Sequence, residues 1–148
     1  MYFVDRELIE DKLQYLEKVT VLFQSKQNWE NAYDKLALER MVQLMMDAVL
    51  DVGNAMIDGF IMRDPGSYED IIDILVDEKV IETELEKHFK ALLPIRKDLV
   101  QAYTKIDHDK ILHILKDHFE GFTQYPDRIR AYLKNELDTV TAFKPTNS

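Results

Sequence analysis

Apolar residues recur along the chain at steps of three and four, the spacing that places them on one face of an α-helix. Asp5 can cap a first helix, which we expect to end in the polar stretch 24–29. A second helix, from about Asn31 to Met62, is apolar around most of its girth and is predicted to lie at the centre of the fold. Glycine inside a helix costs about 1 kcal/mol relative to alanine. Gly53 therefore indicates the close approach of another helix.

Short breaks separate the second helix from those that follow. The dipeptide Pro65–Gly66 ends it, and Ser67 caps a short third helix, with Asp70 three positions later in a capping-box-like arrangement. A fourth helix is expected from about Glu82. Because proline cannot donate the helical hydrogen bond, we expect a kink or break at Pro94.

The last helix is expected to begin at Asp107 or Asp109 and to bend near Pro126. No internal repeat or low-complexity tract interrupts the pattern. We therefore predict an all-α bundle of about five helices. A single domain is expected over residues 1–143, followed by a frayed tail over 144–148.

Composition narrows the class of protein. The chain has 148 residues, of which 46% are hydrophobic and 32% charged, and this is typical of one soluble domain. Cysteine is absent, which excludes disulfides and thiolate metal sites and favours a cytoplasmic location. The apolar start is too short for a secretory signal, and no apolar run approaches the ~18 residues of a membrane span.

The formal net charge is −9, which argues against non-specific binding of DNA or RNA by the isolated chain. A small basic cleft or a basic partner protein stays compatible with it. Nor do the histidines predict a metal site. His108, His113 and His118 are five residues apart, and each step turns ~140° around a helix. One helix cannot direct them to one ion, so we expect solvated surface histidines, no metal and no cofactor.

A narrow line of polar residues follows the second helix at helical spacing: Glu39, Gln43, Asp47, Asp51, Asn54 and Asp58. The simpler interpretation is that a central helix keeps one edge in water. Alternatively, the line faces a cleft in which Asp51 or Asn54 orients a catalytic arginine.

Such an arginine occurs in the stretch IRKDLVQAYTKID, residues 95–107, which is predicted to continue the fourth helix. Its apolar face comprises Ile95, Leu99, Ala102 and Ile106. Arg96 and Tyr103 are seven residues apart, so two helical turns would bring them onto nearly one face. From the residues alone, the arginine would pair with an acid and the tyrosine would pack at the edge of the core.

Three segments in this order resemble the HepT-like family of the HEPN superfamily: ERMVQLMMDAVLDVGNAMI (39–57), DPGSYEDIIDIL (64–75) and RKDLVQAYTKID (96–107). The resemblance runs from about Asp5 to Leu133. It implies a dimeric all-α bundle related to the ribonuclease toxins of toxin–antitoxin pairs. In such pairs a minimal nucleotidyltransferase silences the toxin by adding AMP to a tyrosine. The resemblance thus implies a homodimer, RNA as substrate and a nucleotidyltransferase antitoxin as partner.

The family's motif is Arg-x-x-x-x-His-x-Tyr, usually with asparagine directly after the arginine. The resemblance places Arg96 and Tyr103 in the arginine and tyrosine positions, with Tyr103 as the AMP acceptor. Gln101 stands in the histidine position and Lys97 in the asparagine position. Metal-independent RNA cleavage needs a group that titrates near neutral pH, and glutamine cannot titrate. We therefore expect cleavage to be weak or lost.

Arg96 and Gln101 are five residues apart, which is ~140° around a straight helix. One helix cannot direct both side chains at one phosphate, whereas a composite cleft across a two-fold dimer can. Two alternatives stay open beside a weakened ribonuclease. One is a regulatory dimer that binds a nucleotide, RNA or protein without chemistry, and the other is a purely structural dimer.

Overall fold

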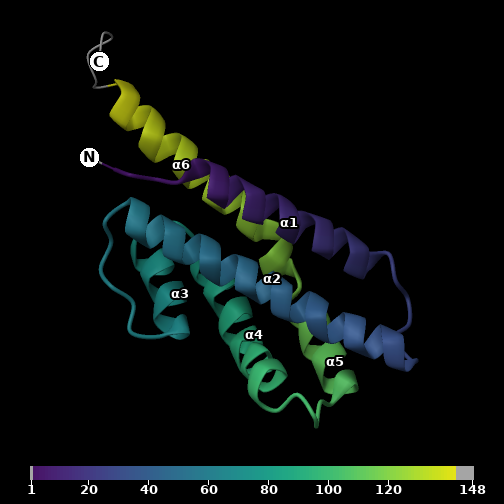
Figure 1. The fold of residues 1–148 in the computed structure, drawn as a ribbon. Helices are drawn as coiled ribbons and strands as arrows, with labels where there is room; N and C mark the ends of the chain where they lie inside the picture. Colours follow the sequence, from purple (N-terminus) through teal and green to yellow (C-terminus); the bar gives the residue numbers. More distant parts are fainter. Residues whose placement is uncertain (1, 143–148) are drawn as a thin grey trace.

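The computed structural model describes residues 2–142, and their side chains up to residue 138, as a helical bundle without a strand (Figure 1). The predicted all-α class is confirmed. The described part of the chain forms six helices rather than about five: α1 (Arg6–Gln24), α2 (Ala32–Gly59), α3 (Tyr68–Asp77), α4 (Thr83–Gln101), α5 (His108–His118) and α6 (Glu120–Ala142). The tail predicted over 144–148 lies outside the described residues.

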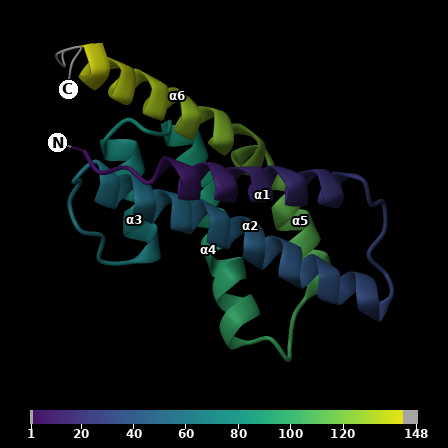
Figure 2. The same cartoon turned by 45° about the horizontal axis from the view of Figure 1, so that its top comes forward.

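The additional helix arises because the predicted last helix is divided at Phe119. α5 ends at His118, and the chain changes direction before α6, as both views show (Figures 1 and 2). The Phe119 ring lies against Phe23 of α1, with 5.1 Å between the ring centres. Pro94 and Pro126 lie inside α4 and α6, so the predicted break at Pro94 is absent and the division falls at Phe119 instead of near Pro126.

As predicted, α2 is the central helix. It contacts α1, α3, α4 and α6, and its apolar face is almost completely buried. At Gly53 the α3 helix comes so close that an added Cβ atom would lie 2.7 Å from Cγ2 of Ile71. The close approach that Gly53 indicated is therefore confirmed, and it sets how near α3 lies to α2.

Side-chain caps fix where several helices begin. Asp5 accepts a hydrogen bond from the backbone N–H of Leu8 at 3.1 Å, and Ser67 accepts one from Asp70 at 3.0 Å. Both caps were predicted. Asp107 caps α5 in the same way, which sets the position at which the chain must have left α4.

Candidate functional site

The site forms where α2, α3 and α4 meet around Arg96. Its Nε donates a hydrogen bond to Oδ1 of Asp47 on α2 at 2.6 Å. On another side, Cζ of the guanidinium lies 4.7 Å from the centre of the Tyr68 ring on α3. Only 18% of the Arg96 side chain is exposed. The guanidinium is therefore held by a carboxylate and by an aromatic ring, on two different helices.

The environment of Arg96 keeps it charged. Burial by itself lowers the pKa of an arginine, because the charged form loses water. The hydrogen bond and the negative charge of Asp47 outweigh burial, so the pKa of Arg96 is raised above its ordinary value. Arg96 is therefore a permanent cation that can bind a phosphate, and it cannot act as an acid or base near neutral pH.

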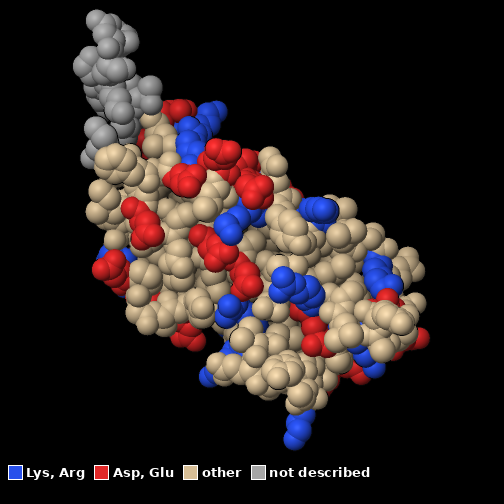
Figure 3. Space-filling model, in the orientation of Figure 1, with Lys and Arg blue, Asp and Glu red and all other residues tan. Residues whose placement is uncertain are grey.

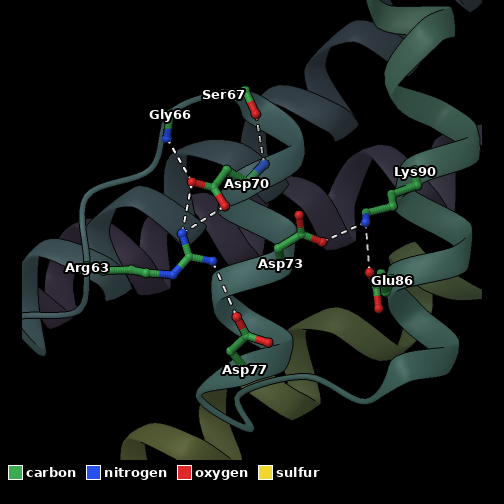
Figure 4. A network of polar contacts seen from close by, with 8 residues as sticks. All are labelled: Arg63, Gly66, Ser67, Asp70, Asp73, Asp77, Glu86 and Lys90. Atoms are coloured by element: carbon green, nitrogen blue, oxygen red, sulfur yellow. Dashed lines mark hydrogen bonds and ion pairs between the residues drawn. The ribbon is translucent and has the colours of Figure 1, made fainter.

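Tyr68 is the first residue of α3, and a polar network anchors this end of the helix (Figure 4). Arg63 donates to both carboxylate oxygens of Asp70, at 2.9 and 3.0 Å. The same carboxylate accepts from the backbone N–H of Gly66 at 2.8 Å, while Ser67 caps the helix. The pattern differs from a capping box in one detail. The Asp70 carboxylate accepts a hydrogen bond from the backbone N–H of Gly66, the residue that precedes the cap residue Ser67. These hydrogen bonds therefore hold the backbone that carries Tyr68 in place.

A second set of ion pairs ties α3 to α4 (Figure 4). Lys90 on α4 lies 2.6 Å from Asp73 on α3 and 2.8 Å from Glu86 on its own helix. Arg63 reaches along α3 to Asp77 at 3.3 Å. Of these contacts, the pair of Lys90 with Asp73 joins α3 to the helix that carries Arg96.

Gln101 and Tyr103 lie at the end of α4, where the structure differs from the prediction. α4 ends at Gln101, and Ala102 has left the helical conformation with φ −115° and ψ 37°. Tyr103 is in the turn that follows, and 66% of it is exposed. The predicted shared helix face of Arg96 and Tyr103 is therefore wrong. Apolar spacing continues past Gln101, but Ala102 is exposed because the chain turns here to reach the Asp107 cap.

The sequence predicts three supporting residues for the arginine: Asp51, Asn54 and Lys97. Asp51 lies 3.1 Å from Lys12 on α1, and the carboxylate that orients Arg96 is Asp47, one helical turn earlier. Asn54 and Lys97 are exposed. The polar line on α2 does reach the arginine, but it does so through a residue that the pattern did not single out.

Tyr68 was not predicted from the sequence, and Asp47 was named only as a member of the polar line, without its link to Arg96. Asp47 belongs to a line of polar residues one turn apart, and periodicity cannot tell which turn faces Arg96. Tyr68 follows the cap residue Ser67, and a tyrosine there gives no signal until α3 and α4 are placed in space. The segment 64–75 that carried the family resemblance does contain Tyr68.

The histidines are not all solvated as predicted. His113 is exposed, but Nε2 of His108 lies 2.9 Å from a carboxylate oxygen of Glu39. His88 and His118, both half-buried, face each other with 3.0 Å between their Nδ1 atoms. Burial lowers the pKa of His118, and the charge that His88 can carry lowers it further. Within residues 2–138 no three potential ligands cluster in a way that could hold a metal ion.

The surface around the fold has no continuous basic stripe on the face shown in Figure 3, where acidic and basic side chains are interspersed. None of the helices described between residues 2 and 142 has both the length and the apolar character needed to cross a membrane.

The described residues define an all-α bundle in which an arginine of α4 is held by residues of α2 and α3. Residues 9–129 match the family model described as ribonuclease HepT-like. The chain therefore belongs to the ribonuclease HepT-like family.

Comparison with known proteins agrees with this membership. The Bacillus subtilis protein named "Putative RNase YutE" is 48% identical over 144 residues, which cover 97% of this chain and 100% of the relative. The solved YutE structure, described as a cytosolic protein of unknown function, superposes with a TM-score of 0.90 over 93% of this chain and 96% of that one, at 47% identity.

Two further matches come from Shewanella oneidensis. The mRNA nuclease HepT is 26% identical over 90 residues, which cover 61% of this chain and 68% of the relative. A tri-AMPylated HEPN toxin in complex with its MNT antitoxin superposes with a TM-score of 0.76 at 21% identity, over 85% of this chain and 98% of that one. The structural similarity to this toxin supports a fold shared by the two proteins.

Proposed function

We propose that this protein is a dimeric HepT-type ribonuclease relative in which Arg96 binds an RNA phosphate and RNA cleavage is weak or lost. The observation that carries the proposal is the fixed guanidinium of Arg96, which is held by Asp47 and by the Tyr68 ring. The guanidinium of Arg96 is planar, permanently charged and already oriented, and these properties favour the binding of a phosphate group. The name of the nuclease relative supports RNA as the ligand.

The chemistry explains why activity is expected to be weak. Cleavage without a metal needs one group to take the proton from the ribose 2′-hydroxyl and another to protonate the leaving oxygen. Arg96 can stabilise the charge that develops on the phosphate. Gln101 can only form hydrogen bonds, and losing acid–base help typically lowers the rate by ~10²–10⁴-fold.

A homodimer completes the proposed cleft. Arg96 and Gln101 lie ~140° apart around α4, so they cannot address one phosphate from the same chain. The end of α4 also exposes apolar surface, with Val100 45% and Tyr103 66% exposed. In the proposed dimer, Gln101 and Tyr103 of one protomer face Arg96 of the other.

The proposed partner is a nucleotidyltransferase-type antitoxin that adds AMP to Tyr103. The exposed position of Tyr103 in the turn after α4 gives an enzyme access to its hydroxyl. The AMPylated toxin with the same fold supports this modification. We place the protein in the cytoplasm, as its relative YutE is described.

The test is to restore the missing acid–base group. Gln101 is exposed at the end of α4, so Gln101→His is expected to fold and to raise the rate of RNA cleavage over the wild type. The gain is expected to depend on pH near the histidine pKa of about 6.5. Rates are measured on a labelled RNA, with circular dichroism as the folding control.

The double variant Arg96→Ala, Gln101→His is expected to lose this gain, because the phosphate is no longer held. A wild type that already cleaves RNA efficiently would show that Gln101 does not disable the site. If Gln101→His folds, dimerises and stays inactive, a second element is missing, and Lys97 in the asparagine position is the first to restore. The regulatory dimer without chemistry, which Gln101 also favours, then becomes the better proposal.

A further inference from the structure

Tyr68 has a second ring face that the contact with Arg96 does not use. The guanidinium covers one face at 4.7 Å, yet 51% of Tyr68 is exposed. The backbone below the ring is held by the Arg63, Asp70 and Ser67 contacts, so the ring is presented from a rigid helix start (Figure 4). An exposed, rigid aromatic beside a phosphate-binding arginine is the arrangement with which proteins hold unpaired bases.

We infer that the exposed face of Tyr68 is a nucleobase-stacking subsite for single-stranded RNA, next to the phosphate bound by Arg96. This inference rests on the proposed function and adds the class of substrate. Because Tyr68 and Arg96 are in contact, the stacked base and the bound phosphate belong to the same nucleotide or to neighbouring ones. A base inside a duplex offers no free face, so the subsite selects an unpaired nucleotide.

The charge of the protein favours this mode of binding. The formal net charge of −9 argues against a mode of binding that relies on many phosphate contacts. Stacking does not depend on charge, and every base has a flat face, so a single ring can add affinity without a basic surface. Arg96 then sets the position of the backbone while Tyr68 holds the base.

The experiment uses fluorescence anisotropy with short single-stranded oligonucleotides that carry 2′-fluoro groups in place of the attacking hydroxyls. One oligonucleotide is complete, and each of the others lacks one base at a different position. For the wild type, one position is expected to matter, and removing its base weakens binding roughly 5- to 150-fold. Tyr68→Ala is expected to bind the complete oligonucleotide that much more weakly and to become insensitive to that position.

Two variants serve as controls. Tyr68→Phe keeps the ring but lacks the hydroxyl that also interacts with Arg96, and it is expected to stay sensitive to the same base position. Tyr33→Ala removes a tyrosine that is 87% exposed at the start of α2, and it is expected to leave binding unchanged.

The possible results separate this inference from the proposed function. If Tyr68→Ala binds like the wild type, the ring holds no base. If it weakens all oligonucleotides equally and the one position still matters, Tyr68 acts only by positioning Arg96, and the stacking subsite is wrong. If the wild type binds none of the oligonucleotides, the proposed RNA binding itself is overturned, and this inference with it.

Discussion

The pairing of Arg96 with Asp47 limits what this arginine can contribute to catalysis. The carboxylate keeps the guanidinium charged and aligned, and a group that stays protonated near neutral pH cannot serve as a base. Acid–base help has to come from another side chain. For this reason position 101 is the informative one to change.

Tyr103 offers a test of the proposed antitoxin partner at the same scale. Incubation with a cognate nucleotidyltransferase and ATP is expected to add AMP to the exposed Tyr103 hydroxyl, visible as added mass on the intact protein. Tyr103→Phe lacks the acceptor oxygen and is expected to lose that mass, whereas Tyr33→Phe, also exposed, keeps it. A wild type that stays unmodified beside an active enzyme would leave Tyr103 as an ordinary surface residue.

Arg96 could be named from the sequence, but the residues that hold it could not. Arg96, Gln101 and Tyr103 came from the resemblance to the family's motif, which is a pattern along the chain. Asp47 and Tyr68 lie 49 and 28 positions before Arg96 in the printed sequence, and only packing brings them to it. Spacing along one helix says nothing about the register between two helices.

Between elements, the contact of α2 with α3 depends on Gly53. Gly53→Ala gains up to about 1 kcal/mol of helix propensity. It also forces a Cβ atom to within 2.7 Å of Ile71, and overpacking of this kind costs about 1–3 kcal/mol. The steric cost is expected to win, so the urea midpoint falls. Asp58→Ala, at an exposed position of α2, is the control and is expected to be neutral or slightly stabilising. A Gly53→Ala variant more stable than the wild type would show that α3 can move away freely.

Where α4 contacts α5, His118 makes stability depend on pH. The pKa of His118 is lowered in the folded state, so the unfolded chain binds more protons below the ordinary histidine pKa of about 6.5. Stability is therefore present above that pH and is lost as the pH falls through the lowered value. Asp117 opposes this shift in the pKa of His118, and Lys87 adds to it.

Urea unfolding at pH 7.5 and pH 5.5 measures the effect. His118→Gln is expected to show a smaller loss of stability on acidification than the wild type, while His113→Gln, at an exposed position, keeps the full loss. Equal losses in all three proteins would mean that His118 does not contribute to the pH dependence of stability in this range.

The elements themselves were predictable where local signals are strong. Asp5 and Ser67 begin helices because their side chains satisfy free backbone N–H groups, and this preference is readable in any sequence. The division at Phe119 has no such signal. Phe119 keeps helical angles of φ −60° and ψ −30°, and its ring packs against Phe23 of a distant helix, so the change of direction belongs to tertiary structure.

At the scale of the whole molecule, we predict a homodimer formed through the end of α4. Light scattering at micromolar concentration is expected to give twice the chain mass of 17.5 kDa. Val100→Glu places a charge on the proposed interface and is expected to shift the protein towards monomer. Val21→Glu changes a valine on α1 that is 63% exposed, and it is expected to stay dimeric. A monomeric wild type would remove the basis for a cleft shared between protomers.

Arg130 joins the first helix to the last, since it donates to Glu10 at 2.8 Å and to Glu17 at 2.7 Å. Glu10 and Glu17 lie 120 and 113 positions before Arg130 in the sequence, so these ion pairs close long loops. During synthesis at ~5–20 residues per second, Arg130 is added to the chain roughly 6–24 s after Glu10. For most of that interval the nascent chain has the two carboxylates of α1 without the cation of α6 that joins them in the folded protein.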